Sequence, residues 1–289
     1  MYLDFSVERA PQVAGSFYPD NPRLLREEVT RLIQLADLSL RGEVIGLLAP
    51  HAGYVYSGSV AGSAYSTVEG ECYDTVILVS PSHREAFNFA SILANGCYKT
   101  PLGPLNVDES MASRIAEFDN GSRLSEHGHH NNGMMGEHSL EVQLPFLQIA
   151  LDDAFKIVPI VMGAQHAAAA NSLAQAIARA VRSSGKRVLL VASSDLSHFH
   201  TDEEARRLDT QIWKSVSTYD TDSIWVEIES GRGEACGVGP IVTVMVAARE
   251  LGADQAIPLD YGTSGDVPLG RRDSVVGYLS AAFIRREGE

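Results

Sequence analysis

The sequence predicts a single α/β domain in which helices flank a central, mainly parallel or mixed β-sheet. Short apolar runs rich in β-branched residues alternate with longer helical patterns through most of the 289 residues. Several runs are apolar throughout, as expected of strands that are buried on both faces of a sheet. Because no repeat, low-complexity tract or Gly/Ser/Pro linker divides the chain, we take residues 1–289 as one domain.

Four of these apolar runs are expected to form the centre of the sheet: Glu43–Leu48, Tyr73–Ser80, Phe155–Met162 and Arg187–Ser193. Two later runs are expected to form strands near a sheet edge: Gln255–Tyr261 and Ser274–Ile284. Helical spacing of apolar residues predicts four helices between them: Arg23–Ala36, Ala168–Arg182, Glu203–Val216 and Ile241–Leu251. Leu140–Leu151 is a further amphipathic run, and Gly121–Gly136 reads as one irregular loop.

The composition excludes several classes of partner. The chain carries 23 Lys and Arg against 37 Asp and Glu, a formal net charge of −14, which argues against nucleic acid or an anionic membrane surface. Its three cysteines form no regular pattern, and we expect no disulfide framework. We see no signal peptide and no apolar run long enough to span a bilayer, so we expect a cytoplasmic protein.

Histidines follow three of the predicted strands. His51 and His83 come shortly after the first two strands, and His198 follows the strand that ends at Ser193. Ligands of open α/β sheets bind beyond the carboxyl ends of the strands. Each histidine alone is more simply a loop residue, but three matched positions indicate a shared site.

Cys236 precedes the buried helix that Pro240 can start, and it is flanked by glycines. The helix dipole and free backbone N–H groups would favour its thiolate. A thiolate and two neutral imidazoles form a three-ligand site with open positions, which suits iron, copper or zinc. The simpler alternative is that Cys236 is a small buried apolar residue.

Other polar residues carry weaker signals. Glu137 is expected in the first turn of a helix, or as a partner that orients an imidazole, and His138 follows it. Asp195 can cap a turn or hold the His198 ring in one tautomer. The remaining candidates are taken as structural or solvated, namely Cys72, Cys97 and the His127, His129 and His130 tract.

Six motifs resemble the Memo family, known in prokaryotes as AmmeMemoRadiSam system protein B. They are Val13–Pro19, Ala49–Tyr54 with Tyr56–Gly58, Ser80–His83, Gly136–Phe146, Ser193–His198 and Ala235–Pro240, and the resemblance runs from about Val13 to Tyr278. The family is structurally similar to LigB-type class III extradiol dioxygenases, which use non-haem iron. The resemblance therefore implies a LigB-like fold.

The resemblance implies that His51, His83 and Cys236 bind one metal ion per chain, with iron or copper favoured and zinc possible. It also implies that His198 and Asp195 form an acid–base pair in the same pocket, where Tyr54, Glu137 and His138 are expected as neighbours. In the dioxygenases the third ligand is a carboxylate. Because Cys236 stands there instead, dioxygenase activity does not carry over.

Two functions of different classes follow from these observations. The first is a metal-dependent redox enzyme that acts on an unknown small molecule, with His198 moving a proton. The second is a non-catalytic interaction module that works with a radical-SAM or AMMECR1-type protein, partners that the family name records. A hydrolase based on Cys236 or on zinc is a third and weaker alternative.

Overall fold

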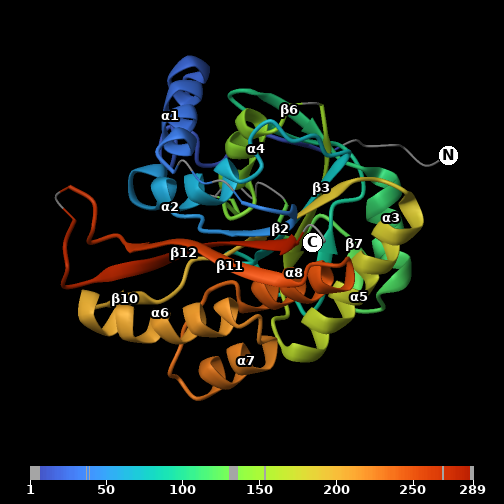
Figure 1. Ribbon diagram of the computed structural model, residues 1–289. Helices are drawn as coiled ribbons and strands as arrows, with labels where there is room; N and C mark the ends of the chain where they lie inside the picture. Colours follow the sequence, from blue (N-terminus) through green and yellow to red (C-terminus); the bar gives the residue numbers. More distant parts are fainter. Residues whose placement is uncertain are drawn as a thin grey trace.

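A mixed β-sheet lies between two layers of helices in the computed structural model (Figure 1), which confirms the predicted fold class. The structure describes residues 7–36, 38, 40–129, 136–152, 154–268 and 270–286. Within these residues the main sheet has the order β10-β12-β2-β9-β3-β8-β4-β7, and β11 pairs with β12. None of the helices in the described ranges has the length and apolarity that a membrane crossing needs.

Four parallel strands form the centre of the sheet, as the apolar runs predict. They are β2 (Glu43–Ala49), β9 (Val188–Ser193), β3 (Thr75–Pro81) and β8 (Lys156–Met162). Each is almost entirely buried, which explains why its sequence shows a continuous apolar run and not an alternating one. Because these strands are parallel, their carboxyl ends meet at one edge of the sheet.

Shorter or antiparallel strands flank this centre. On one side β12 (Val275–Arg285) pairs antiparallel with β2, and β11 (Gln255–Thr263) and β10 (His198–His200) pair with β12. On the other side, β4 (Ala90–Ile92) and β7 (Ser122–Leu124) follow β8. A separate small sheet contains β1 (Glu8–Arg9), β5 (Cys97–Thr100) and β6 (Gly103–Asn106).

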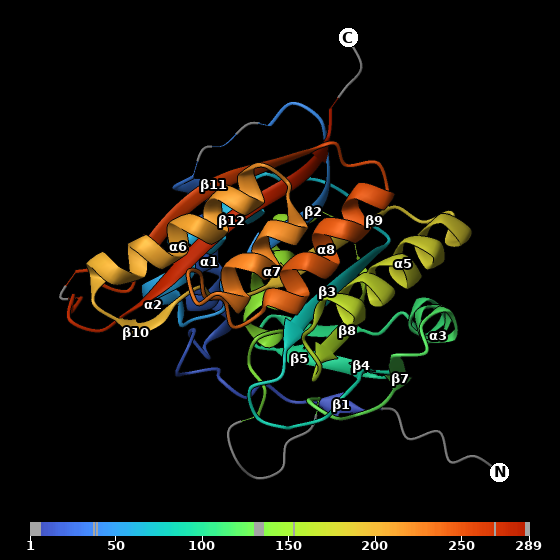
Figure 2. The ribbon, with the colours of Figure 1, turned by 90° about the horizontal axis from the view of Figure 1, so that it is seen from below.

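Helices cover both faces of the main sheet (Figures 1 and 2). One layer contains α1 (Pro22–Gln34), α2 (Tyr54–Ser66) and α4 (Leu144–Ala150), which follows a 3-10 turn, η1 (Glu141–Gln143). The opposite layer contains α5 (Ala167–Ser184), α6 (Asp202–Ser217), α7 (Thr221–Glu229) and α8 (Val238–Glu250), with α3 (Glu109–Phe118) packed against α5. Figure 2 shows α5 to α8 lying across the sheet.

The predicted helix starts are confirmed for α1 and α6. The Asn21 side chain accepts hydrogen bonds from the backbone N–H groups of Arg23 and Leu24, and Pro22 is the first helical residue. Thr201 caps α6 in the same way, through the N–H of Glu204. In contrast, α8 begins at Val238, two residues before Pro240, so that Cys236 lies directly against its first turn.

The sequence gives little sign of α2, because serine, glycine and tyrosine are weak helix formers. Tertiary packing is the reason that this segment is helical. A Cβ atom on Gly62 would lie 2.3 Å from the Leu32 carbonyl oxygen, so only glycine lets α2 approach α1 this closely. The helix therefore depends on its neighbour more than on its own propensity.

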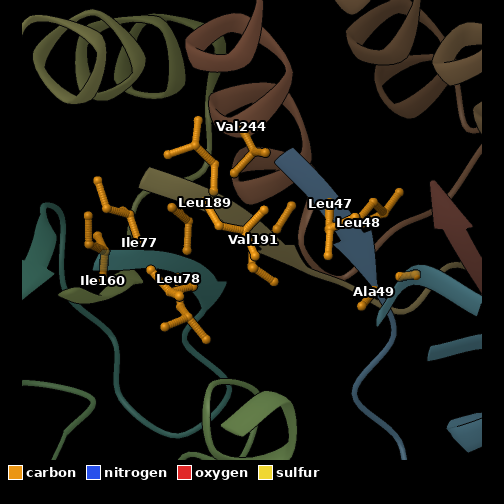
Figure 3. Packing of buried hydrophobic residues seen from close by; sticks show 14 of the residues in the cluster. Leu47, Leu48, Ala49, Ile77, Leu78, Ile160, Leu189, Val191 and Val244 are labelled. Atoms are coloured by element: carbon orange, nitrogen blue, oxygen red, sulfur yellow. The ribbon is translucent and has the colours of Figure 1, made fainter. Parts of the chain in front are cut away.

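Apolar side chains of the central strands form the core on both faces of the sheet. Figure 3 shows Leu47, Ile77, Ile160 and Leu189 from four strands, with Val244 of α8 nearby. All five are fully buried. At roughly 25 cal/mol per Å² of apolar surface removed from water, this burial is the main source of stability.

A buried ion pair fixes the N-terminal segment to the start of η1. Arg9 Nη1 lies 2.7 Å from Glu141 Oε2, and both side chains are enclosed. The Glu141 carboxylate also accepts bonds from the N–H groups of Gln12 and Val13 and from the Tyr18 hydroxyl. Since Arg9 also donates to the Glu137 carbonyl, the pair anchors the segment that carries His138.

We expect Glu141→Gln to lower the free energy of unfolding by about 3–5 kcal/mol, because it leaves the Arg9 cation buried without its counter-charge. Urea unfolding followed by circular dichroism measures this as a lower midpoint. Glu27→Gln is the matched control, since Glu27 pairs with Arg23 at an exposed site and should change stability by at most about 0.5 kcal/mol. Equal midpoints for Glu141→Gln and the wild-type protein would contradict this account.

Candidate metal site

Three loops that leave neighbouring parallel strands bring the predicted site residues together. β9 lies between β2 and β3, and Ala49 is in register with Ser193 at their ends. His51, His83 and Asp195 each follow the last residue of one of these strands by two positions. The His51 and His83 rings lie 5.1 Å apart between centroids. The loops that leave these separate strand ends therefore lie close together in space.

His138 joins these two histidines. Its ring lies 5.1 Å from that of His83 and 5.5 Å from that of His51. One ligand nitrogen from each of the three residues lies within 4.8 Å of the others, a spacing that allows all three to bind one ion. The sequence places His138 only as a pocket neighbour, because no strand end precedes it and its loop position depends on tertiary contacts.

Cys236 reaches the same cluster from the start of α8. Its Sγ lies 3.3 Å from His51 Nε2. The Cys236 N–H donates to the Asp195 carbonyl, and the Asp195 N–H donates to Sγ at 3.3 Å, so two backbone contacts fix the loop. Gly237 is required here because a Cβ atom would lie 2.7 Å from the Ser193 carbonyl oxygen.

The expectation of a thiolate at Cys236 is wrong for the metal-free protein. Burial raises the pKa of the Cys236 thiol well above its ordinary value, and the nearby Asp195 carboxylate acts in the same direction. The backbone N–H groups that begin α8 have other partners: Gly237 donates to Ser194 Oγ and Gly239 donates to Gln165 Oε1. The helix terminus therefore does not stabilise a negative charge on the sulfur.

His51 and His138 are electrically neutral for the same reason. Burial lowers the pKa of His51 well below its ordinary value, and the neighbouring His83 and His138 rings lower it further. Burial lowers the pKa of His138 to about 4. Its Nδ1 is enclosed and has no hydrogen-bond partner among the described residues. Glu137 Oε1 lies 3.7 Å from this nitrogen, beyond hydrogen-bond distance, so His138 Nδ1 is available to bind a metal ion.

Glu137 lies before η1 and not in the first turn of a helix, so its role as an N-terminal acid is not confirmed. Its carboxylate instead accepts bonds from His83 Nδ1 at 3.0 Å and from the His83 backbone N–H. Burial alone would raise the pKa of Glu137, but the hydrogen bonds from His83 outweigh it and keep that pKa well below its ordinary value. Glu137 therefore orients an imidazole, the second of its two predicted roles.

Asp195 and His198 do not form the expected pair. The Asp195 carboxylate accepts from the His51 N–H at 2.7 Å, and burial raises the pKa of Asp195 to about 7. The His198 ring is held by the Leu196 carbonyl, 2.9 Å from Nδ1. Local backbone geometry thus orients His198, whereas Asp195 fixes the His51 loop.

Other candidate residues serve the surrounding structure. The Tyr54 hydroxyl donates to the Val142 carbonyl inside the core, so it is directed away from the cluster. His129 is buried, with Nδ1 2.5 Å from the Tyr98 hydroxyl, which corrects the expectation of a solvated loop there. His130 lies outside the described residues, and His127 is exposed. Cys72 is exposed and Cys97 is buried in β5.

A cavity of about 560 Å³ opens beside the cluster. His138 and Asp195 form its inner wall, and Phe17, Tyr56 and Tyr278 supply aromatic surface. This volume is within the range of small-molecule sites in proteins. The resemblance implies a pocket with Asp195 and His138, but the sequence gives no sign of the aromatic wall, which combines residues from the N-terminal segment, α2 and β12.

The Memo-like protein family model matches residues 9–282 of this chain. The chain is 37% identical over 276 residues to a MEMO1 family protein of Methanosarcina mazei, covering 94% of this chain and 97% of that protein. A MEMO1 family protein of Methanosarcina acetivorans is 38% identical with the same coverage. A third, from Sulfolobus acidocaldarius, is 37% identical over 288 residues, covering 95% of this chain and 99% of that protein.

The chain belongs to the Memo family. This membership confirms the resemblance that the motifs indicate, and all six motifs contribute residues to the cluster or to the walls of the cavity beside it. Different loops or element ends of the Memo fold contribute the residues of this cluster and its support, namely His51, His83, His138, Ser193 and Cys236.

The donor atoms of this Memo-family site fit a transition metal. Neutral imidazole nitrogens and one cysteine, which would release its thiol proton and bind as the thiolate, are ligands that iron, copper and zinc accept. With metal–nitrogen and metal–sulfur bonds of roughly 2.0 and 2.3 Å, two ligands of a tetrahedral ion lie about 3.5 Å apart. The observed 3.3 Å between Cys236 Sγ and His51 Nε2 agrees with this spacing.

In the metal-free protein we expect Cys236 to react at least about tenfold more slowly with a thiol reagent at pH 8 than the exposed Cys72, because each unit of raised pKa lowers the thiolate fraction about tenfold. Stopped-flow absorbance with Ellman's reagent measures both rates. Cys72→Ser should remove the fast phase, and Cys236→Ser should leave it unchanged. Loss of the fast phase in Cys236→Ser instead would show that Cys236 is the activated thiol.

Proposed function

We propose that this protein is a mononuclear metalloprotein with a redox function, and that iron or copper, with zinc as a third candidate, is bound by His51, His83 and Cys236. The single observation that supports this most strongly is the convergence of three imidazoles from separate loops, with Cys236 Sγ 3.3 Å from His51 Nε2. Chance contacts between surface histidines do not explain a buried His51 whose pKa is strongly lowered. His138 is a fourth candidate ligand.

A bound iron or copper ion would supply a Lewis-acidic and redox-active centre with open coordination positions. The chain itself supplies a proton acceptor. Because the Leu196 carbonyl accepts from His198 Nδ1–H, and burial lowers the pKa of His198, its Nε2 carries an unprotonated lone pair. We assign His198 as the general base and Asp195 as the residue that holds the His51 loop.

The substrate that this site favours is a small molecule. The cavity of about 560 Å³ is bordered by His138 on the cluster side and by Phe17, Tyr56 and Tyr278 elsewhere. Aromatic walls favour a substrate with an apolar or planar part. We propose a cytoplasmic location, because the spacing of the three cysteines in the sequence indicates no disulfide framework.

Protein purified anaerobically with reductant should contain about one iron or copper ion per chain by mass spectrometry. His51→Ala should abolish tight binding, because it removes the ligand that touches both the thiol and the other imidazoles. His127→Ala is the control, since His127 is an exposed histidine outside the cluster. A wild-type protein that stays empty after reconstitution would exclude the metalloprotein and favour an interaction module that works with a radical-SAM or AMMECR1-type partner.

Cobalt substitution distinguishes the two possible third ligands. If Cys236 binds the ion, Co²⁺ loading should produce a sulfur-to-metal charge-transfer band that Cys236→Ser removes and His138→Gln retains. If the ion lies among His51, His83 and His138, the thiolate band should be absent from the wild-type protein, and His138→Gln should weaken binding by about 10- to 100-fold. The second outcome would contradict the proposed role of Cys236.

A further inference from the structure

A chain of buried hydrogen bonds lies behind His51, on the side opposite Cys236. His51 Nδ1 is 2.9 Å from Ser193 Oγ. Ser193 Oγ is in turn 2.7 Å from the Ser139 carbonyl oxygen and 2.8 Å from Gln143 Nε2. Tyr65 completes the chain with its hydroxyl 2.8 Å from Gln143 Oε1. All five residues are buried, so the direction of each bond is determined by the protein and not by water.

The orientation of the Gln143 amide follows from its neighbours. Its nitrogen lies 3.0 Å from the Pro50 carbonyl oxygen, a group that can only accept. That end of the side chain is therefore the donating NH₂ group, and the same group donates its second proton to Ser193 Oγ. The other end is the amide oxygen, which accepts from the Tyr65 hydroxyl. Gln143 thus occupies one lone pair of the Ser193 oxygen.

Ser193 has a single proton, and the Ser139 carbonyl takes it. A carbonyl oxygen has no proton to give, so the bond between these two groups has only one possible direction. In the remaining bond, between His51 Nδ1 and Ser193 Oγ, the His51 Nδ1–H group must therefore donate and the Ser193 oxygen must accept. With its proton on Nδ1, a neutral His51 has an unprotonated Nε2, the atom that faces Cys236 Sγ.

Glu137 imposes the same tautomer on His83, with a carboxylate as the acceptor in place of a serine hydroxyl. A carboxylate can only accept, and Glu137 Oε1 lies 3.0 Å from His83 Nδ1. The proton of a neutral His83 is therefore also on Nδ1. In their neutral forms both imidazoles therefore carry the proton on Nδ1 and leave Nε2 without one, so no proton needs to move between their ring nitrogens when an ion binds.

We propose that Ser193, aligned by Gln143 and the Ser139 carbonyl, is a positioning residue that locks His51 in the Nδ1–H tautomer and so prepares its Nε2 as a ligand. The ligand role rests on the proposed function, whereas the tautomer is a property of the metal-free chain. The consequence for binding is pre-organisation: His51 loses neither rotational freedom nor a proton position when it coordinates.

Nitrogen-15 NMR of the metal-free, full-length protein labelled at histidine tests the tautomer directly. Long-range proton–nitrogen correlation spectra distinguish a protonated ring nitrogen from an unprotonated one, and His51→Gln identifies the His51 signals. We expect a protonated Nδ1 and an unprotonated Nε2 at pH 7.5. A protonated Nε2, or averaged shifts of an exchanging mixture, would overturn the proposal.

Ser193→Ala tests whether the hydroxyl is the cause. This change removes the acceptor for His51 Nδ1–H, and we expect a tautomer mixture together with a 10- to 100-fold weaker metal affinity. Ser193→Thr keeps a hydroxyl on the strand and should restore the single tautomer. Ser80→Ala is the matched control, because Ser80 is a buried serine near the end of the adjacent strand β3 whose hydroxyl is directed to the Pro81 carbonyl.

The outcomes separate this proposal from the metalloprotein proposal. A single Nδ1–H tautomer in a protein that binds no metal would support the proposed role of Ser193 and refute the proposed metal function. Metal binding by a protein whose His51 carries its proton on Nε2 would support the metalloprotein proposal and refute the proposed tautomer. If Ser193→Ala retains the tautomer, Ser193 is not the positioning residue. If that variant does not fold, the wild-type spectrum still decides which tautomer is present.

Discussion

The parallel alignment of β2, β9 and β3 is the constraint on which the site depends. Strands in this arrangement lie about 4.8 Å apart, so the loops that leave their carboxyl ends begin side by side. His51, His83 and Asp195 follow those ends at the same spacing, and this places their side chains within reach of one another. α8 packs against β9 and β3 and brings Cys236 to the same position. A shift in strand register would separate the loops.

Buried polar contacts behind the cluster hold the His51 and His83 rings in one orientation. Glu137 holds His83, Ser193 holds His51, and Asp195 binds the backbone of the His51 loop. The Arg9–Glu141 pair supports the segment that contains Glu137 and His138. Because water is excluded from most of these contacts, a lost partner leaves a buried polar group unsatisfied, and such groups are costly. The geometry of the cluster therefore depends on residues that surround the three imidazoles.

Burial determines the protonation of the cluster. Removing charge from water is unfavourable, so the buried imidazoles remain neutral, the Cys236 thiol keeps its proton and the pKa of Asp195 moves to about 7. The sequence predicts the opposite for Cys236, because a helix start favours a thiolate when its N–H groups are available. Here Ser194 and Gln165 occupy those groups, and neither residue is adjacent to α8 in the sequence.

Sequence alone is enough to predict the α/β class, the four central strands and the loops that carry His51, His83 and Cys236, because apolar periodicity and position beside a strand or helix end are local properties. Contacts made in the folded chain are needed to make α2 helical, to bring His138 to the cluster and to let Leu196 rather than Asp195 orient His198. These features depend on contacts between residues that are distant in sequence or on exact backbone geometry. The same holds for the tautomer of His51, which depends on where Ser139, Gln143 and Ser193 meet.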